Sequence, residues 1–193
     1  MSKLERVRAK VRELYLSKDP NRAEWADWLY GNHVLVVAET AGKLAKKYGA
    51  SEGLSEVAAL LHDIADTEMA RMSSSHEKRS LEIARQVMTE AGFTTDEISL
   101  VVDDAIRYHS CNGAERPKSK EGLILATADS LAHLRTDFYI YAAWSFGKGR
   151  SLEELKKWAL KKIDRDLNNK ISFDDERESA RTDYNMIKEL FSR

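Results

Sequence analysis

Apolar residues recur at three- and four-residue steps through almost every segment of this chain of 193 residues. This spacing places them along one side of an α-helix, whereas a half-buried strand needs strict alternation of apolar and polar residues. Only 2 prolines and 9 glycines are present, too few for the many tight turns of a β-sandwich or barrel. We therefore predict an all-α fold, a bundle of about seven or eight helices.

The length suits one domain, and no repeat, low-complexity tract or linker marks an internal boundary. We expect a single helical domain over residues 1–193, in which helices within 151–192 pack on the core or form a dimer contact. Thr94 with Glu97, and Ser151 with Glu154, have the spacing of capping boxes that begin helices. The expected helices cover about 4–17, a longer segment ending at Gly49, 54–65, the segment from Ser73-Ser74-Ser75 to Gly92, 94–109, 121–146, a segment beginning at Ser151, and a final helix carrying Ala180, Tyr184, Ile187 and Phe191.

The charged residues nearly cancel, with 31 Lys and Arg against 32 Asp and Glu. This balance argues against duplex nucleic acid or an anionic membrane as a partner, so that any phosphate recognition must be local. The single cysteine, Cys111, cannot form an intramolecular disulfide, and the charged N-terminus has no apolar signal region behind it. No apolar run approaches the length of about 18 residues that a membrane span needs. We expect a cytoplasmic protein.

Six polar side chains fall on helix faces that are otherwise apolar. Buried polar groups need partners, and each residue alone has an ordinary explanation, as a hydrogen-bonded core histidine or a capping aspartate. Jointly, imidazole and carboxylate groups are the ligands that divalent transition metals prefer, and no thiolate cluster competes with them. We therefore predict a metal site formed by some or all of His33, His62, Asp63, His76, His109 and Asp129.

The order of these residues resembles that of the HD-domain superfamily of metal-dependent phosphohydrolases. The resemblance rests on His33, on His62-Asp63 within Ala-Ala-Leu-Leu-His-Asp-Ile-Ala, and on Asp129 within Ala-Thr-Ala-Asp, and it covers about residues 32–133. The resemblance implies an HD-type helical fold in which the His, His-Asp and Asp set holds a metal.

Some members of the superfamily add two histidines between the His-Asp pair and the last Asp, and hold two metals. His76 and His109 occupy those places, so the resemblance implies a dinuclear site with Asp63 as the bridging ligand. The connection to His76 is short, and this residue has two other interpretations, as a substrate contact or as part of a helix start. The expected cofactor is one or two divalent ions, of Fe, Mn, Co, Ni or Zn, with Mg as a further candidate.

Many relatives carry a Lys three residues after the His-Asp pair, where this chain has Asp66. Asp66 is a candidate catalytic residue beside Asp63, because its carboxylate can orient water or a metal-bound histidine; Glu68 can act similarly, and a solvated acidic turn is the alternative. Positive charge for a substrate must then come from elsewhere. The candidate substrate-binding residues are Lys78, Arg79, Arg107 and His133, with Lys118 as a loop option and Trp25 and Trp28 as stacking partners for a base; surface charge, structural hydrogen bonding and aromatic packing are the respective alternatives.

The sequence therefore predicts an enzyme, a metal-dependent phosphohydrolase that uses metal-activated water on a small phosphomonoester or nucleotide. Two alternatives remain: a di-iron oxygenase of the HD type acting on a small polar substrate, and a non-catalytic ligand sensor that keeps the fold. The intact ligand set argues against a sensor, because a scaffold alone does not need a cation site in its core. Metal identity and phosphate release separate the phosphohydrolase from the oxygenase.

Overall fold

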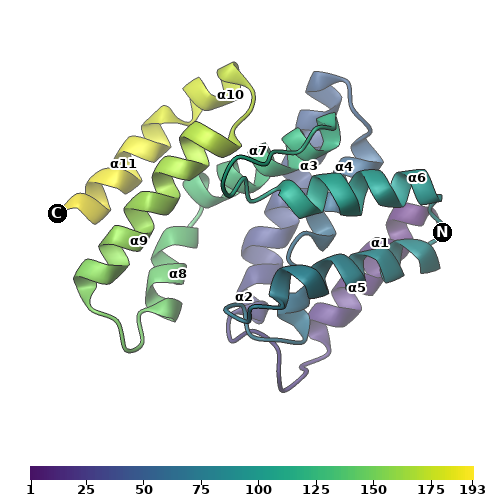
Figure 1. Cartoon of the computed structure of the whole chain (residues 1–193), viewed down its shortest axis with the longest axis horizontal. Helices are drawn as coiled ribbons and strands as arrows, with labels where there is room; N and C mark the ends of the chain where they lie inside the picture. The colour runs from purple at the N-terminus through teal and green to yellow at the C-terminus, as the bar shows by residue number, and fades with distance from the viewer.

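The computed structural model describes residues 1–193 and contains helices without any strand, which confirms the predicted all-α class (Figure 1). The elements in chain order are α1 Lys3–Leu16, α2 Ala26–Leu29, a π-helical turn η1 Tyr30–Val34, α3 Leu35–Tyr48, α4 Glu52–Leu61, a 3-10 turn η2 Ile64–Thr67, α5 His76–Glu90, α6 Thr95–Ile98, a π-helical segment η3 Ser99–Ile106, α7 Lys120–Arg135, α8 Phe138–Phe146, α9 Leu152–Arg165, a π-helical turn η4 Asp166–Lys170, α10 Asp174–Ser179 and α11 Arg181–Ser192.

Local sequence signals account for several helix starts. The capping boxes predicted at Thr94 and Ser151 are both present. Each hydroxyl accepts from the backbone N–H three residues later, and the glutamate at that position accepts from the backbone N–H of the capping residue. The serine cluster before α5 differs, since Ser75 makes no side-chain capping bond. α3 ends at Gly49, whose left-handed backbone (φ 68) allows the chain to leave the helix without a Cβ clash.

Helix α7 is the central element of the fold. It packs against α3, α4 and η3 on one side and against η4 and α11 on the other. In Figure 1, α1 and α3 to α6 lie toward the right, α2 lies below α7, and α8 to α11 form a second group at the left. One continuous apolar core of 44 buried residues spans both groups, so the C-terminal helices pack on the remainder of the chain.

The single helix predicted over 121–146 is wrong, because the chain breaks between α7 and α8. The hydroxyl of Thr136 accepts from the backbone N–H of Phe138 at 3.3 Å and donates to the carbonyl of Ala132 at 2.7 Å. These local bonds compete with the helical ladder, and Thr136 adopts an extended backbone. The break turns Phe138 and Tyr139 back toward α7, where both rings are buried.

One further boundary and three internal segments differ from the prediction in ways that matter for the site. The helix expected over 54–65 ends at Leu61, and the chain passes through His62 and Asp63 into a 3-10 turn. Three segments expected to be regular α-helix contain π-helical turns.

No helix of the structure combines the length and the hydropathy that crossing a membrane requires.

Candidate metal centre

Four side chains from separate parts of the bundle converge beneath α7. His33 lies in η1, His62 and Asp63 lie at the end of α4, and Asp129 lies in the middle of α7. His33 Nε2 lies 3.3 Å from His62 Nε2 and 3.1 Å from Asp129 Oδ1. His62 Nε2 lies 3.3 Å from Asp63 Oδ2 and 3.8 Å from Asp129 Oδ1. The structure thus brings together the four residues on which the sequence resemblance rests.

The separations of 3.1 and 3.3 Å fit a shared divalent cation, the 3.8 Å between His62 Nε2 and Asp129 Oδ1 is longer, and His33, His62 and Asp129 form one group of possible ligand atoms within 4.8 Å of one another. Ligand atoms about 2.0–2.2 Å from one ion lie roughly 3.0–3.4 Å apart at octahedral or tetrahedral angles. Buried His33 Nδ1 has no hydrogen-bond partner, so a proton on Nδ1 is unsatisfied, whereas a proton on Nε2 faces the other ligands. A proton on His33 Nε2 donates to Asp129 Oδ1 when no ion is bound, and the same imidazole and carboxylate atoms are the ligand types that a divalent transition metal prefers.

Backbone carbonyls orient two of the histidine rings toward this cluster. His62 Nδ1 donates to the carbonyl of Ala59 at 2.7 Å, and His109 Nδ1 donates to the carbonyl of Ile106 at 2.6 Å. A carbonyl only accepts, so the proton of the neutral ring resides on Nδ1 and the Nε2 lone pair is left for a ligand role. Burial lowers the pKa of His109 to about 4, which keeps its ring neutral at physiological pH.

The structure separates the two additional histidines of the predicted set. His109, with His62 and Asp63, forms a second group of possible ligand atoms within 4.8 Å of one another. His76 Nε2 instead lies 2.9 Å from Asp66 Oδ1, and His76 belongs to neither ligand group. Asp66 is fully buried behind His76, as a partner of a histidine rather than at the cavity surface.

Both carboxylates of the cluster are paired with cations, Asp63 with the half-buried Arg71 and Asp129 with the buried Lys170. Arg71 donates to Asp63 Oδ2, and its Nη1 lies 3.3 Å from Asp66 Oδ2. Lys170 donates to Asp129 Oδ2, which leaves Oδ1 directed at the histidines. Burial opposes ionisation, but Arg71 holds the pKa of Asp63 well below its usual value, and His133 and Lys170 do the same for the pKa of Asp129.

His133 connects this cluster to the C-terminal helices. Its Nε2 lies 3.2 Å from Asp129 Oδ1 and its Nδ1 lies 2.9 Å from Asp166 Oδ2. The hydroxyl of Tyr139 also donates to Asp166, and Lys162 Nζ lies 3.5 Å from the same carboxylate. Burial lowers the pKa of His133 to about 3. From sequence alone, His133 has either a site role or a structural hydrogen bond. In the structure it makes the structural contact with Asp166 and also adjoins the candidate ligand Asp129.

A cavity of about 450 Å³ opens onto the cluster. Its polar lining includes Asp63, Asp129 and all the histidines except His33. One wall is aromatic, and the basic groups come from two distant parts of the sequence. The aromatic side chains are Trp25, Phe138, Phe146 and Trp158. The basic side chains are Arg71, Lys162, Arg165 and Lys170. Trp28, the other tryptophan considered for stacking, packs on Tyr141 with ring centroids 4.2 Å apart and does not line the cavity.

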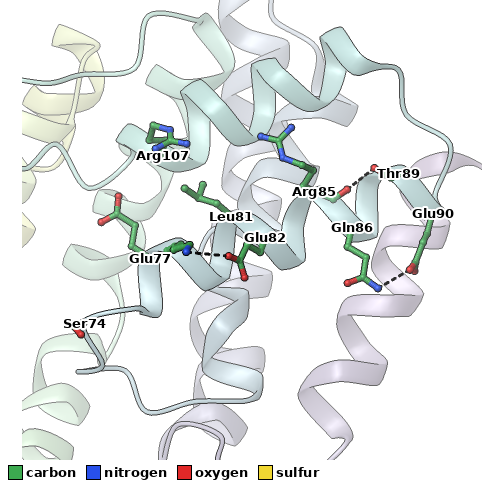
Figure 2. A pocket seen from close by; sticks show the side chains of 10 residues that line it. Ser74, Glu77, Leu81, Glu82, Arg85, Gln86, Thr89, Glu90 and Arg107 are labelled. Atoms are coloured by element: carbon green, nitrogen blue, oxygen red, sulfur yellow. Dashed lines mark hydrogen bonds and ion pairs between the residues drawn. The ribbon is translucent and has the colours of Figure 1, made fainter.

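Lys78, Arg79 and Arg107 do not line this cavity, although the sequence offered them as substrate-binding residues. Lys78 and Arg107 face a separate groove of about 940 Å³, shown in Figure 2. The labelled side chains there, among them Glu82 and Arg85, mix both charge signs along α5. Arg79 pairs with Glu68 and Glu82. Lys78, Arg79 and Arg107 were predicted from their closeness in sequence to His76 and His109. That criterion does not identify cavity residues, because neighbouring residues of a helix point to different faces.

The basic residues that do reach the cavity include several that sequence reasoning missed. Helical spacing predicts a solvated basic face for Lys162, and it gave no site role to Asp166 or Lys170. A signal was present: Asp166 and Lys170 follow buried Ile163 by three and seven residues, the spacing of one helix face. Arg71 lies in the loop before α5, where no periodicity predicts its direction.

Comparison with known proteins assigns the chain to a family. The HD domain family matches residues 30–134, more than half of the chain, and the protein therefore belongs to this family. The fold is also similar to the crystal structure of a predicted HD superfamily hydrolase from an uncultured Thermotogales bacterium, with a TM-score of 0.62 and 23% sequence identity. That alignment covers 100% of this chain and 91% of the other. No curated protein matches the chain.

Proposed function

We propose that this protein is a metal-dependent phosphohydrolase that acts on a small phosphomonoester or nucleotide. The observation that carries the proposal is the convergence of His33, His62, Asp63 and Asp129 at the base of a cavity that is also lined by basic side chains. Membership of the HD domain family supports the proposal. The limited volume of the cavity, about 450 Å³, favours a small substrate.

The residues divide into holding and positioning roles. His33, His62 and Asp129 form one group of possible ligand atoms, and His62, Asp63 and His109 form another, so the five residues would hold one divalent ion or two, with His62 common to both groups. The donor set suits Fe, Mn, Co, Ni or Zn, and tolerates Mg. A bound ion supplies the chemistry of lowering the pKa of water and withdrawing charge from a phosphoryl oxygen.

The chain itself supplies the remaining electrostatics. Arg71 lies on the loop beside Asp63 and Asp66, so a guanidinium provides positive charge near the turn where many relatives have a lysine. Lys162 and Lys170 line the opposite side of the cavity, and the aromatic wall excludes water from part of it. Fixed cations aimed at a phosphoryl group stabilise the charge that spreads over its oxygens during transfer. Asp63 is the carboxylate closest to this chemistry, and Asp66 acts through His76.

Phosphate release from a panel of phosphomonoesters and nucleotides tests the proposal. Wild type should release phosphate, Asp63→Ala should lose at least about a hundredfold in rate, and Lys78→Gln, in the separate groove, should retain wild-type rates. Retention of activity by Asp63→Ala would refute the assigned site. A tightly held pair of irons without any phosphate release would contradict a hydrolase and favour the oxygenase alternative.

A further inference from the structure

A second groove adjoins the metal cavity on the C-terminal side. It measures about 700 Å³ and lies between α9, the start of η4 and the loop after His109. The two hollows share Asn112, Trp158, Lys162 and Arg165. We propose that this groove is an anion site that binds a second phosphoryl group of the substrate. The proposal rests on the proposed function only in assigning that group to the substrate.

Arg165 is the centre of the proposed site, because its charge has no partner in the protein. No carboxylate oxygen lies within ion-pair distance of its guanidinium, and its one side-chain partner is the neutral Oδ1 of Asn112. Its Nε is buried without a hydrogen-bond partner. A guanidinium without a counter-ion in the protein is stabilised by an anion in the adjoining groove, and its planar fork matches phosphate geometry.

The surrounding charges favour an anion over a cation. Lys161 and Lys162 line the groove with Arg165, and the single carboxylate in the lining is Asp164. That carboxylate is already engaged, because Asp164 Oδ1 accepts from Tyr184 and lies 2.9 Å from Lys188 Nζ. The groove therefore presents Lys161 and Arg165 to a ligand without a carboxylate partner, beside Lys162, which also pairs with Asp166, and its acidic group is neutralised by α11. Such an arrangement recognises a phosphoryl group, which offers several charged acceptor oxygens at once.

Lys162 links the groove to the metal cavity. Its Nζ lies 3.2 Å from His133 Nδ1, and His133 in turn lies 3.2 Å from the candidate ligand Asp129. Asn112, held by Arg165, lies three residues after His109. The shared lining allows one molecule to occupy both hollows, with one phosphoryl group at the candidate ligands and another at Arg165.

Isothermal titration of inorganic phosphate into the full-length protein tests this site. The comparison uses wild type, Arg165→Gln, Arg165→Lys and a matched control, Lys157→Gln, whose exposed lysine lies on the same helix outside the groove. Arg165→Gln should weaken phosphate binding by about tenfold or more, Arg165→Lys should weaken it less, and Lys157→Gln should match wild type. Circular dichroism confirms that each variant retains its helices.

The metal centre is removed in a separate arm, by chelation and dialysis of wild type and by His62→Ala. Both should keep the Arg165-dependent phosphate binding while losing hydrolysis, so a failure of the proposed function does not remove the signal of the anion site. Equal phosphate affinity in wild type and Arg165→Gln would overturn the proposal. Loss of all phosphate binding on chelation would also overturn it, because the phosphate would then bind only at the metal centre.

Discussion

Each of three carboxylates around the candidate metal centre lies beside a positively charged side chain of the protein. Asp63 pairs with Arg71, Asp129 with Lys170, and Asp166 is flanked by Lys162 and Lys170. Charges removed from water are costly unless they are paired, so these cations stabilise the carboxylates when no metal is bound. The same cations lower the affinity for a divalent ion, because like charges repel across a short distance in a poorly screened interior.

Replacing Lys170 by Met separates these two effects. Without metal, Asp129 loses its buried partner, and the free energy of unfolding should fall by about 3 kcal/mol. A divalent ion should restore more stability in this variant than in wild type, because the competing ammonium is gone. Chemical denaturation with and without the ion measures both quantities, and Lys157→Met serves as the exposed control. A metal effect in Lys170→Met no larger than that in wild type would show that the ammonium does not oppose the ion.

The buried neutral histidines predict a pH dependence of stability. Burial lowers the pKa of His109 from 6.5 to about 4 in the folded protein. The unfolded chain therefore binds more protons between these values, and stability present above pH 6.5 should be lost as the pH falls through about 4. Thermal unfolding of chelated protein across this range measures the slope. His109→Asn should flatten it, and an unchanged slope in that variant would assign the effect to other groups.

Three π-helical turns shape the site at the level of elements. η1 contains His33, η4 begins at Asp166 and ends at Lys170, and η3 leads into the turn that carries His109. A π turn inserts one residue into a helix and rotates the later residues relative to the preceding face. Apolar periodicity predicted the inward direction of His33 and Asp129, because each has apolar neighbours on both sides at helical spacing. It did not assign Lys162 or Lys170 to the site, since a lysine beside an apolar stripe has the same pattern whether it faces water or a cavity.

Asp104 holds the loop that contributes Asn112. Its carboxylate accepts from the backbone N–H of Lys118 at 2.9 Å and of Ser119 at 2.8 Å, where Ser119 caps α7. Asp104→Ala leaves these donors without their partner and should lower the free energy of unfolding by about 1–3 kcal/mol. Asp103→Ala removes only solvent-exposed pairs with Arg85 and Arg107 and should change the free energy of unfolding by about 0.5 kcal/mol or less. Equal effects in urea denaturation would contradict the assigned anchor.

Across the whole molecule, the site extends beyond the segment that defines the family. The match to the HD domain family ends at residue 134, while Lys162, Arg165 and Lys170 reach the cavity from α9 and η4. The fold class and the four central candidate ligands were predictable from sequence, because periodicity and a short motif agree there. The cavity lining from Lys162, Arg165 and Lys170 was not predictable. Its position depends on how α9 packs after the break at Thr136, which helical spacing alone does not specify.

A bound ion should stabilise the entire fold, since its candidate ligands come from η1, the end of α4 and α7. A ligand present at about a hundredfold above its Kd adds about 2.7 kcal/mol to the free energy of unfolding. For a chain of this length, that corresponds to a rise of roughly 5–10 °C in Tm. Thermal unfolding of chelated protein before and after addition of Mn²⁺ or Zn²⁺ measures the shift. A rise of the same size in Asp129→Asn would place the ion elsewhere.

Metal content decides whether His33, His62, Asp63 and Asp129 hold a divalent ion. Elemental analysis of protein purified without chelators, compared between wild type and His62→Ala, gives the number of ions per chain. We predict one or two equivalents of a transition metal in wild type and a nearly complete loss in the folded variant. Wild type that binds no divalent metal under any loading condition, or His62→Ala that retains the wild-type content, would contradict the assignment.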